Sequence, residues 1–491
     1  MLSPKMTADL WYDEVFSLII ARSPFGEMLH RLYVGGDTIP PLYPLLLHLW
    51  MKVGASDAHV KRLSLVFGVA SIFAMYLLAR RAGGKVAGVV SCLLLAASPL
   101  AGYYSIEARP YAVFLFLSLI SGYFFVASVQ EGHGEGASSR LKMLAAGYWV
   151  STALAIYSHW FGLLLPVVHT AGVMIYRPFC HRMIRRHLLS LIGIGCCCLP
   201  LLPFLWKQVG LQAAVGESTW PGRPGLSSLF EIVLLTTGGR ALLALTAAFF
   251  LIAYVGENRQ TIPQKTVLKR NNEFFAAYSL LPVIAVYTIS ILTGHYTFFV
   301  PRYFLPFLVG LYVLVGLAAS RMDWKMAAVW ALAFGLVPVY EAASYWRPPE
   351  NPYSHIAARL SGEDKPGVLI AHLSVASYFP VLHYRGSTAT DKVLWDPATG
   401  GGYLLAYNIG GEMLASGDLV DLGSGLLQYR ELWIVADPVA ADPETKALDE
   451  WLRNNNGLQL LSEERLGQVN LAHYSSIAPR EIPRGQGDSP N

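Results

Sequence analysis

The sequence predicts a polytopic α-helical membrane protein that ends in a small α/β domain. Of its 491 residues, 54% are hydrophobic and only 14% are charged, and the mean hydropathy is +0.41. Soluble domains carry roughly 25% charged residues, so this balance indicates membrane segments. The net charge of +4 is small for the length and does not support nucleic-acid binding, which needs a basic face.

Several apolar stretches approach the length that crosses a bilayer, about 20 residues. We expect about ten spans, at 62–80, 85–103, 109–129, 142–158, 160–177, 188–207, 240–256, 275–294, 299–319 and 325–343. Lys and Arg concentrate in alternate connections, at 80–85, 130–142, 177–187, 256–273 and 320–325. By the positive-inside rule these connections are cytoplasmic and the intervening ones face outward.

Residues 40–54 form the ambiguous segment of this topology. They are short for a span and contain Pro44, His48 and Lys52. If they crossed the membrane, the acidic residues before them would be cytoplasmic while Glu107 stayed external. We expect instead an amphipathic helix lying along the membrane surface, which leaves both groups on the external face.

Beyond the last span the composition shifts toward Asp, Glu, Gly and Asn. Residues 368–371 and 432–435 predict buried strands bounded by turn residues, and 445–454 predicts a helix. The expected domains are a first external loop with interfacial helices at 1–61, a transmembrane helical domain at 62–345, a soluble extracytoplasmic α/β domain at 346–480 and a disordered tail at 481–491.

Two short polar segments, residues 10–14 and 105–111, place charge beside these apolar stretches. Ionisable groups in such positions are costly and usually functional. Asp13 and Glu14 in the first segment have two interpretations. They cap the start of a helix, or they supply a general base that takes a proton from an acceptor hydroxyl at the membrane surface.

The second segment, Glu107-Ala108-Arg109-Pro110-Tyr111, lies where one span ends and the next begins. Pro110 suits the first turn of the returning helix. Glu107 and Arg109 either form a local ion pair or leave Arg109 to bind a phosphate, which its planar guanidinium suits.

Two further external positions carry side chains of interest. His159 lies at the turn between two spans, where a histidine is either a hydrogen-bonded structural residue or part of a site. Arg302 opens the ninth span, and either extends its side chain to the membrane surface or pairs with the phosphate of a lipid.

Taken in order, these motifs resemble the GT-C glycosyltransferases. The resemblance covers about residues 9–345 and is closest to the bacterial branch related to protein O-mannosyltransferases, lipid A aminoarabinose transferases and lipopolysaccharide-core sugar transferases. The motifs that carry it are Leu10–Glu14, Pro40–Tyr43, Glu107–Tyr111, His159–Gly162 and Arg302–Pro306.

The resemblance implies an inverting transfer of a sugar from a polyprenyl-phosphate donor to a hydroxyl of a lipid, glycan or protein. Asp13 then corresponds to the catalytic base, and Glu14 orients the acceptor or a metal. The donor phosphate is expected at Arg109, Arg302 and His159, whose charge or hydrogen bonds stabilise the leaving group. Further substrate-binding residues are expected at Glu107, Tyr111, Tyr43 and Tyr303.

The resemblance also implies a multi-pass protein of the bacterial inner membrane, with the active site and the C-terminal domain facing the periplasm or exterior. Asp13 and Glu14 offer carboxylates to Mg²⁺ or Mn²⁺, although no full ligand set is legible. Members of this family have a span before the acidic loop. Only eight residues precede Asp9 here, so we expect that span to be missing or to lie upstream.

Two other classes of protein fit the composition. A membrane transporter or lipid flippase is expected to carry charges deep within its spans and broken helices at mid-membrane, whereas the charges here cluster at one face. A non-catalytic membrane scaffold that displays its C-terminal domain is the other. The five cysteines have neither disulfide nor zinc-site spacing, and no phosphate-binding Gly loop appears.

Overall fold

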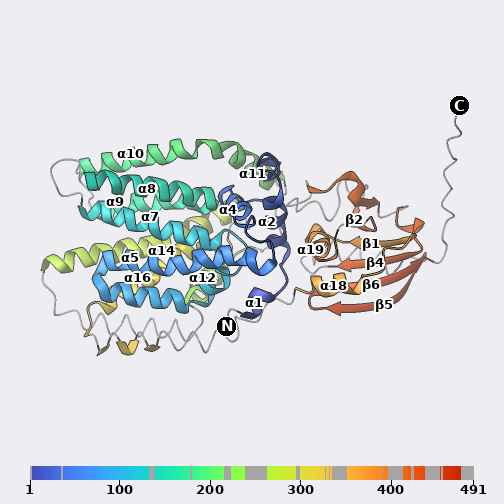
Figure 1. Ribbon diagram of the computed structural model, residues 1–491. Helices are drawn as coiled ribbons and strands as arrows, with labels where there is room; N and C mark the ends of the chain where they lie inside the picture. The colour runs from blue at the N-terminus through green and yellow to red at the C-terminus, as the bar shows by residue number, and fades with distance from the viewer. Residues whose placement is uncertain are drawn as a thin grey trace. The chain divides into compact units, whose positions relative to one another are not determined.

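The chain folds into two units, which we call the helical unit and the sheet unit (Figure 1). The helical unit contains Met1–Thr7 and Ile39–Arg347, and the sheet unit contains Ala8–Thr38 and Pro348–Asn491. The computed structural model describes residues 3–34, 37–131, 139–176, 180–214, 223–237, 262–294, 299–323, 325–326, 328–330, 332–333, 351–386, 389–395, 413–421, 425–436, 450, 454 and 457–476.

Long helices build the helical unit, with α5 packed on α7 and α16, α8 on α7 and α10, and α14 on α9 (Figure 1). The described helices are α1 (Ser3–Thr7), α4 (Leu42–Trp50), α5 (Asp57–Ala97), α6 (Pro99–Tyr104), α7 (Tyr111–Glu131), α8 (Ser139–Ser158), η1 (Trp160–Leu163), α9 (Leu164–Tyr176), α10 (His181–Cys198), η2 (Leu199–Leu201), α11 (Leu202–Ala214), α12 (Leu226–Thr237), α14 (Ile262–Thr293), α15 (Pro301–Leu308) and α16 (Gly310–Ala319).

Five segments within the described residues are long and apolar enough to cross a membrane. They are Asp57–Ala97, Tyr111–Glu131, His181–Gly210, Val267–Thr293 and Pro301–Ala319, and Trp160–Tyr176 is a shorter apolar helix. The expected total of ten spans stays a prediction, because 240–256 and most of 325–343 lie outside the described residues. At nine residues, α4 is too short to span, as the interfacial interpretation of 40–54 requires.

The first two predicted spans belong to one 41-residue helix, α5, which is kinked at Gly84. Gly84 has φ +85°, a conformation that only glycine adopts without strain. Close packing of α5 on α16 depends on another glycine. A Cβ at Gly316 would lie 2.6 Å from the backbone oxygen of Ala87, so only glycine lets the two helices approach this closely.

The sheet unit is built on a six-stranded sheet with the order β3-β2-β1-β4-β6-β5. Strands β1 to β4 pair in parallel, while β6 runs antiparallel to both β4 and β5. The bounds are β1 (Val368–His372), β2 (Asp391–Trp395), β3 (Leu419–Asp421), β4 (Glu431–Ala436), β5 (Leu458–Leu466) and β6 (Val469–Ser476), with α18 (Tyr353–Arg359), α19 (Val375–Arg385), η7 (Ser416–Asp418) and η8 (Leu426–Gln428) between them.

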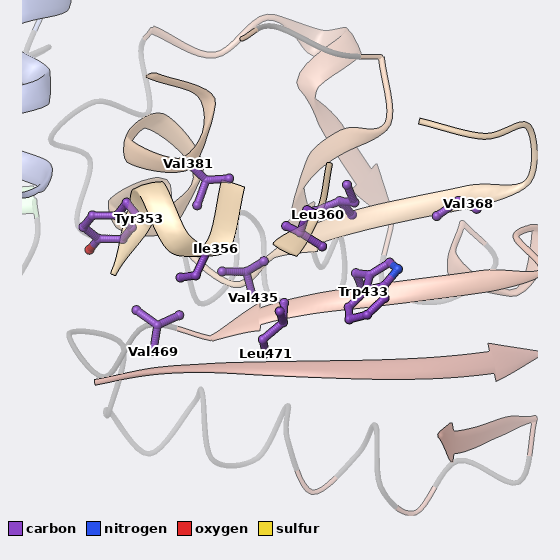
Figure 2. Packing of buried hydrophobic residues seen from close by; sticks show 10 residues of the cluster. Tyr353, Ile356, Leu360, Val368, Val381, Trp433, Val435, Val469 and Leu471 are labelled. Carbon is purple, nitrogen blue, oxygen red and sulfur yellow. The ribbon is translucent and has the colours of Figure 1, made fainter. Parts of the chain in front are cut away.

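The core of this unit lies between α18, α19 and one face of the sheet. Val435 of β4 lies beside Ile356 of α18, and the cluster continues onto β6 with Val469 and Leu471 (Figure 2). The two strands predicted from sequence are the central pair, β1 and β4. All five residues of β1 are buried, which explains why its first four residues form a continuous apolar run. The predicted helix at 445–454 and the predicted tail lie outside the described residues, apart from residues 450 and 454.

The sheet unit also contains two helices from near the start of the chain, α2 (Tyr12–Arg22) and α3 (Phe25–Val34). The four-domain division predicted from sequence placed them in one loop with residues up to 61. The contacts instead group residues 8–38 with the C-terminal segments and residues 39–61 with the membrane helices. Such long-range pairing has no local sequence signal.

Candidate active site

The turn that follows α6 buries two charged residues in the helical unit. Glu107 is 1% exposed and Arg109 is 5% exposed. Two hydrogen bonds shape the turn, since the backbone N–H of Arg109 donates to the carbonyl of Glu107 at 2.7 Å and Ser64 Oγ donates to the carbonyl of Arg109 at 3.3 Å. Tyr43, fully buried on α4, has its hydroxyl 3.3 Å from Ser64 Oγ. Tyr43 is therefore linked to the turn through Ser64.

A lysine from the first helix pairs with the buried acid. Lys5 Nζ lies 3.6 Å from Glu107 Oε2 and donates to the carbonyl of Tyr103 at 3.1 Å. A second buried lysine, Lys61 on α5, donates from Nζ to the carbonyl of Lys5 at 3.0 Å. Sequence analysis missed both residues. Lys61 could have been selected from the sequence, because it is a cation at the edge of a long apolar stretch.

His159 lies in the turn between α8 and η1, against aromatic rings. It stacks on Phe114 with ring centroids 5.1 Å apart, and its ring centroid is 5.0 Å from that of Tyr303 and 5.9 Å from that of Tyr111. Its Nδ1 accepts a hydrogen bond from the backbone N–H of Phe161 at 3.2 Å. In the neutral ring the proton is therefore on Nε2, which makes His159 a hydrogen-bond donor toward a ligand.

The pKa of His159 is lowered from 6.5 to about 3, chiefly by burial and in the same direction by the positive charges of Arg109 and Arg302. The ring is thus neutral near pH 7 and contributes a hydrogen bond rather than a charge. Positive charge near a buried neutral ring suits an anion.

Arg302 enters this cluster from the first turn of α15. Its guanidinium carbon lies 5.7 Å from the ring centroid of Tyr111 and 5.5 Å from that of Tyr303, within cation–π range. The helical unit therefore brings together six predicted site residues, Glu107, Arg109, Tyr111, His159, Arg302 and Tyr303. We call these six residues the cationic cluster.

Tyr104 belongs to the same region and was missed by sequence analysis. Its ring centroid is 5.0 Å from that of Tyr111. Burial raises the pKa of the Tyr104 hydroxyl, the negative charge of Glu107 raises it further, and Arg302 opposes the shift. The hydroxyl therefore stays protonated and is available as a neutral donor beside the cluster.

Asp13 and Glu14 occupy the first turn of α2 in the sheet unit. They are 7% and 2% exposed. Glu14 Oε2 accepts a hydrogen bond from the backbone N–H of Trp11 at 3.1 Å, so it fulfils the capping role that the sequence left open. Both carboxylates also lie where the helix dipole favours negative charge. Their catalytic roles stay a prediction.

The described residues contain no group of three or more His, Cys, Asp or Glu side chains arranged to hold a metal ion. Mg²⁺ is commonly held by one or two carboxylates together with waters and substrate phosphates. Glu14 Oε2 accepts a hydrogen bond from Trp11. The use of a divalent metal by Asp13 and Glu14 stays a prediction.

The sequence and the fold of this chain are similar to those of known proteins. Residues 38–206 match the family model for dolichyl-phosphate-mannose-protein mannosyltransferase. The chain superposes on the crystal structure of ArnT from Cupriavidus metallidurans in the apo state with a TM-score of 0.63 and 13% sequence identity, covering 96% of this chain and 94% of that one. The chain has the GT-C fold.

A second structure of ArnT from Cupriavidus metallidurans, bound to undecaprenyl phosphate, superposes on this chain with a TM-score of 0.61 at 13% identity, again covering 96% and 94% of the two chains. Curated protein sequences give no match. The family model spans Tyr43, the turn at 105–110 and His159 but stops before Arg302. The resemblance predicted from the five motifs is confirmed.

Proposed function

We propose that this protein is an inverting glycosyltransferase that moves a sugar from a polyprenyl-phosphate donor to a hydroxyl of a lipid, glycan or protein. The observation that carries the proposal is the position of Arg302 over the rings of Tyr111 and Tyr303, which border the buried His159, within a GT-C fold. Arg109 is buried in the turn that leads to Tyr111. The ArnT structure bound to undecaprenyl phosphate supports a donor of this chemical class.

The chemistry assigned to the cationic cluster is stabilisation of the leaving phosphate. When the bond between the sugar and the phosphate breaks, negative charge develops on the phosphate oxygens. Arg109 and Arg302 supply positive charge at that place, and His159 supplies a hydrogen bond from Nε2. A lipid phosphate so stabilised leaves without being protonated. Glu107, Tyr111, Tyr43 and Tyr303 stay the predicted further substrate-binding residues.

The proposed base is Asp13, which takes the proton from the acceptor hydroxyl as that oxygen attacks the anomeric carbon. Direct displacement needs one base and one leaving group, and it inverts the anomeric configuration. This role rests on the place of Asp13 in the order of motifs shared with GT-C enzymes. Glu14 holds the start of α2 and, in this proposal, orients the acceptor.

The proposed location is the bacterial inner membrane, crossed several times, with the cationic cluster and the sheet unit toward the periplasm or exterior. Cysteine labelling from the periplasm tests this orientation. A probe in 103–109 should react and a probe in 177–187 should not. The reverse pattern would overturn the assignment of the external face.

The central experiment follows sugar transfer by the purified protein from a synthetic polyprenyl-phosphate sugar to a membrane lipid extract. Asp13→Asn should abolish turnover while leaving donor binding intact, because an amide cannot take the acceptor proton. An unchanged rate removes Asp13 from the role of base. Lipid translocation in vesicles without any sugar transfer would favour the transporter or flippase alternative instead.

The same assay tests the predicted use of Mg²⁺ or Mn²⁺ by Asp13 and Glu14. Titrating a chelator against the rate of sugar transfer, with the metal added back, gives a direct answer. Because Mg²⁺ binds through one or two carboxylates together with substrate phosphates, metal use by the pair should make the rate fall with the chelator and recover when either metal is added back. A rate that the chelator leaves unchanged would overturn the predicted metal.

A further inference from the structure

The segment that carries the acidic pair is bound within the sheet unit by α19. Phe16 of α2 is 1% exposed and packs edge-on against Phe379 of α19, with ring centroids 5.4 Å apart. Tyr12 of α2 lies against Phe16 in turn, with ring centroids 5.9 Å apart. The buried side of α2 thus lies on a helix that the chain forms more than 350 residues later.

Hydrogen bonds fix the residues just before α2. The backbone N–H of Leu10 donates to Tyr384 Oη at 2.7 Å. Asp9 Oδ2 accepts from the backbone N–H of Ser354 at 2.7 Å, and the carbonyl of Asp9 accepts from Asn351 Nδ2 at 3.4 Å. Asp9 therefore accepts a hydrogen bond from a backbone N–H in the first turn of α18, a helix 345 residues further along the sequence.

The helix α19 is in turn fixed to the sheet by a buried polar network. His372 at the end of β1 lies 3.4 Å from Ser377 Oγ of α19 and 3.2 Å from Asp391 Oδ1 of β2. Asp391 also forms an ion pair with Arg385 at the end of α19. Arg385 forms a second ion pair with Asp364, in which Nη2 lies 2.9 Å from Oδ1. Charges buried in this way are tolerated only with their partners in place, which gives α19 one position on β1 and β2.

We propose that the sheet unit is the positioning element of the acidic pair. The sheet holds α19, and α18 and α19 hold residues 9–16, so that Asp13 and Glu14 keep one orientation at the start of α2. Asp9 and Tyr384 are positioning residues in this scheme. The proposal rests on the proposed function, in which Asp13 is the base. In it, the C-terminal segments position that base.

The experiment uses hydrogen exchange and steady-state kinetics on the full chain. Tyr384→Phe and Asp9→Ala should each raise amide exchange over residues 9–22 and lower kcat about tenfold, the effect of losing one hydrogen bond, while KM for a synthetic polyprenyl-phosphate sugar stays unchanged. Asp9→Asn keeps a capping oxygen and should behave like the wild type. Thermal unfolding identifies any variant that fails to fold.

A matched control removes a hydrogen bond of the sheet unit that does not involve α2. Asn470 donates to Glu463 at 2.5 Å on the exposed β5–β6 pair, so Asn470→Ala should leave both exchange over 9–22 and kcat unchanged. Unchanged exchange in both Tyr384→Phe and Asp9→Ala would overturn the proposal, as would raised exchange with an unaltered kcat. Absence of sugar transfer by the wild type would instead overturn the proposed function, because the exchange measurement does not depend on activity.

Discussion

Lys5 Nζ lies 3.6 Å from Glu107 Oε2, and both side chains are almost fully shielded from solvent, with 6% and 1% of their surfaces exposed. The pair joins the first helix of the chain to the turn that carries Arg109. An ion pair buried to this degree is costly to break, because either partner left alone is a desolvated charge.

The first prediction follows from this pair. Glu107→Gln removes the negative charge that faces the buried Lys5 and should lower the free energy of unfolding by about 3–5 kcal/mol. The double variant Lys5→Met with Glu107→Gln should recover most of that loss in thermal unfolding. The control is the exposed pair Glu27–Arg31, where Glu27→Gln should cost about 0.5 kcal/mol or less. Equal losses at the two sites would contradict the expectation.

The second prediction concerns binding of a lipid phosphate by the cationic cluster. Arg302→Ala should weaken the affinity of the purified protein for undecaprenyl phosphate by about 10- to 100-fold, since hydrogen bonds to charged groups contribute about 1.5–3 kcal/mol. Arg302→Lys should recover only part of the affinity, because a lysine lacks the planar fork. Arg80, an exposed arginine on α5, provides the control. The same weakening in Arg80→Ala would mean that binding follows net charge alone.

The third prediction is a dependence of stability on pH. The pKa of His159 lies at about 3 in the folded protein against 6.5 for an ordinary histidine, so the unfolded chain binds this proton more readily. The stability that the neutral ring contributes is therefore complete above about pH 6.5 and is lost as the pH falls toward 3. The unfolding temperature should fall more steeply with acidification in the wild type than in His159→Gln. Parallel curves would refute this assignment.

The fourth prediction is that alanine substitution has opposite effects on stability at two glycines that both have open space around them. Nothing lies within 4 Å of a Cβ built at Gly84 or at Gly195, but only Gly84 has a positive φ, of +85°. Gly84→Ala should therefore cost about 1–2 kcal/mol of unfolding free energy. Gly195→Ala, inside α10, should be neutral or stabilise the protein by up to about 1 kcal/mol. Thermal unfolding of both variants would show whether the sign differs between them.

The sequence allowed the central strands and the cationic cluster to be predicted, since each has a local signal. Strands β1 and β4 each contain a continuous apolar run, at 368–371 and 432–435, and Arg109, His159 and Arg302 are polar residues next to apolar spans. Strand β5 was missed because it is an exposed edge strand with a charged sequence, Ser462-Glu463-Glu464-Arg465 at its centre. Such a strand has no buried face to create a pattern.

Other features had no local signal at all. The pairing of Lys5 with Glu107 joins residues about a hundred positions apart, and the bond between Asp9 and Ser354 joins residues 345 positions apart. Each depends on the finished fold. The resemblance to GT-C enzymes supplied the roles of the motifs, whereas the grouping of residues 8–38 with the C-terminal segments came only from the structure.

That grouping has a consequence for biosynthesis. Asp9 leaves the ribosome 345 residues before its partner Ser354. At about 5–20 residues per second, the acidic segment waits roughly 20–70 s for the surface on which it folds. A chain that stops translation shortly before Ser354 would carry the whole cationic cluster and still have no support for Asp13. The acidic segment therefore assembles only after residues 351–384 have been made, long after its own synthesis.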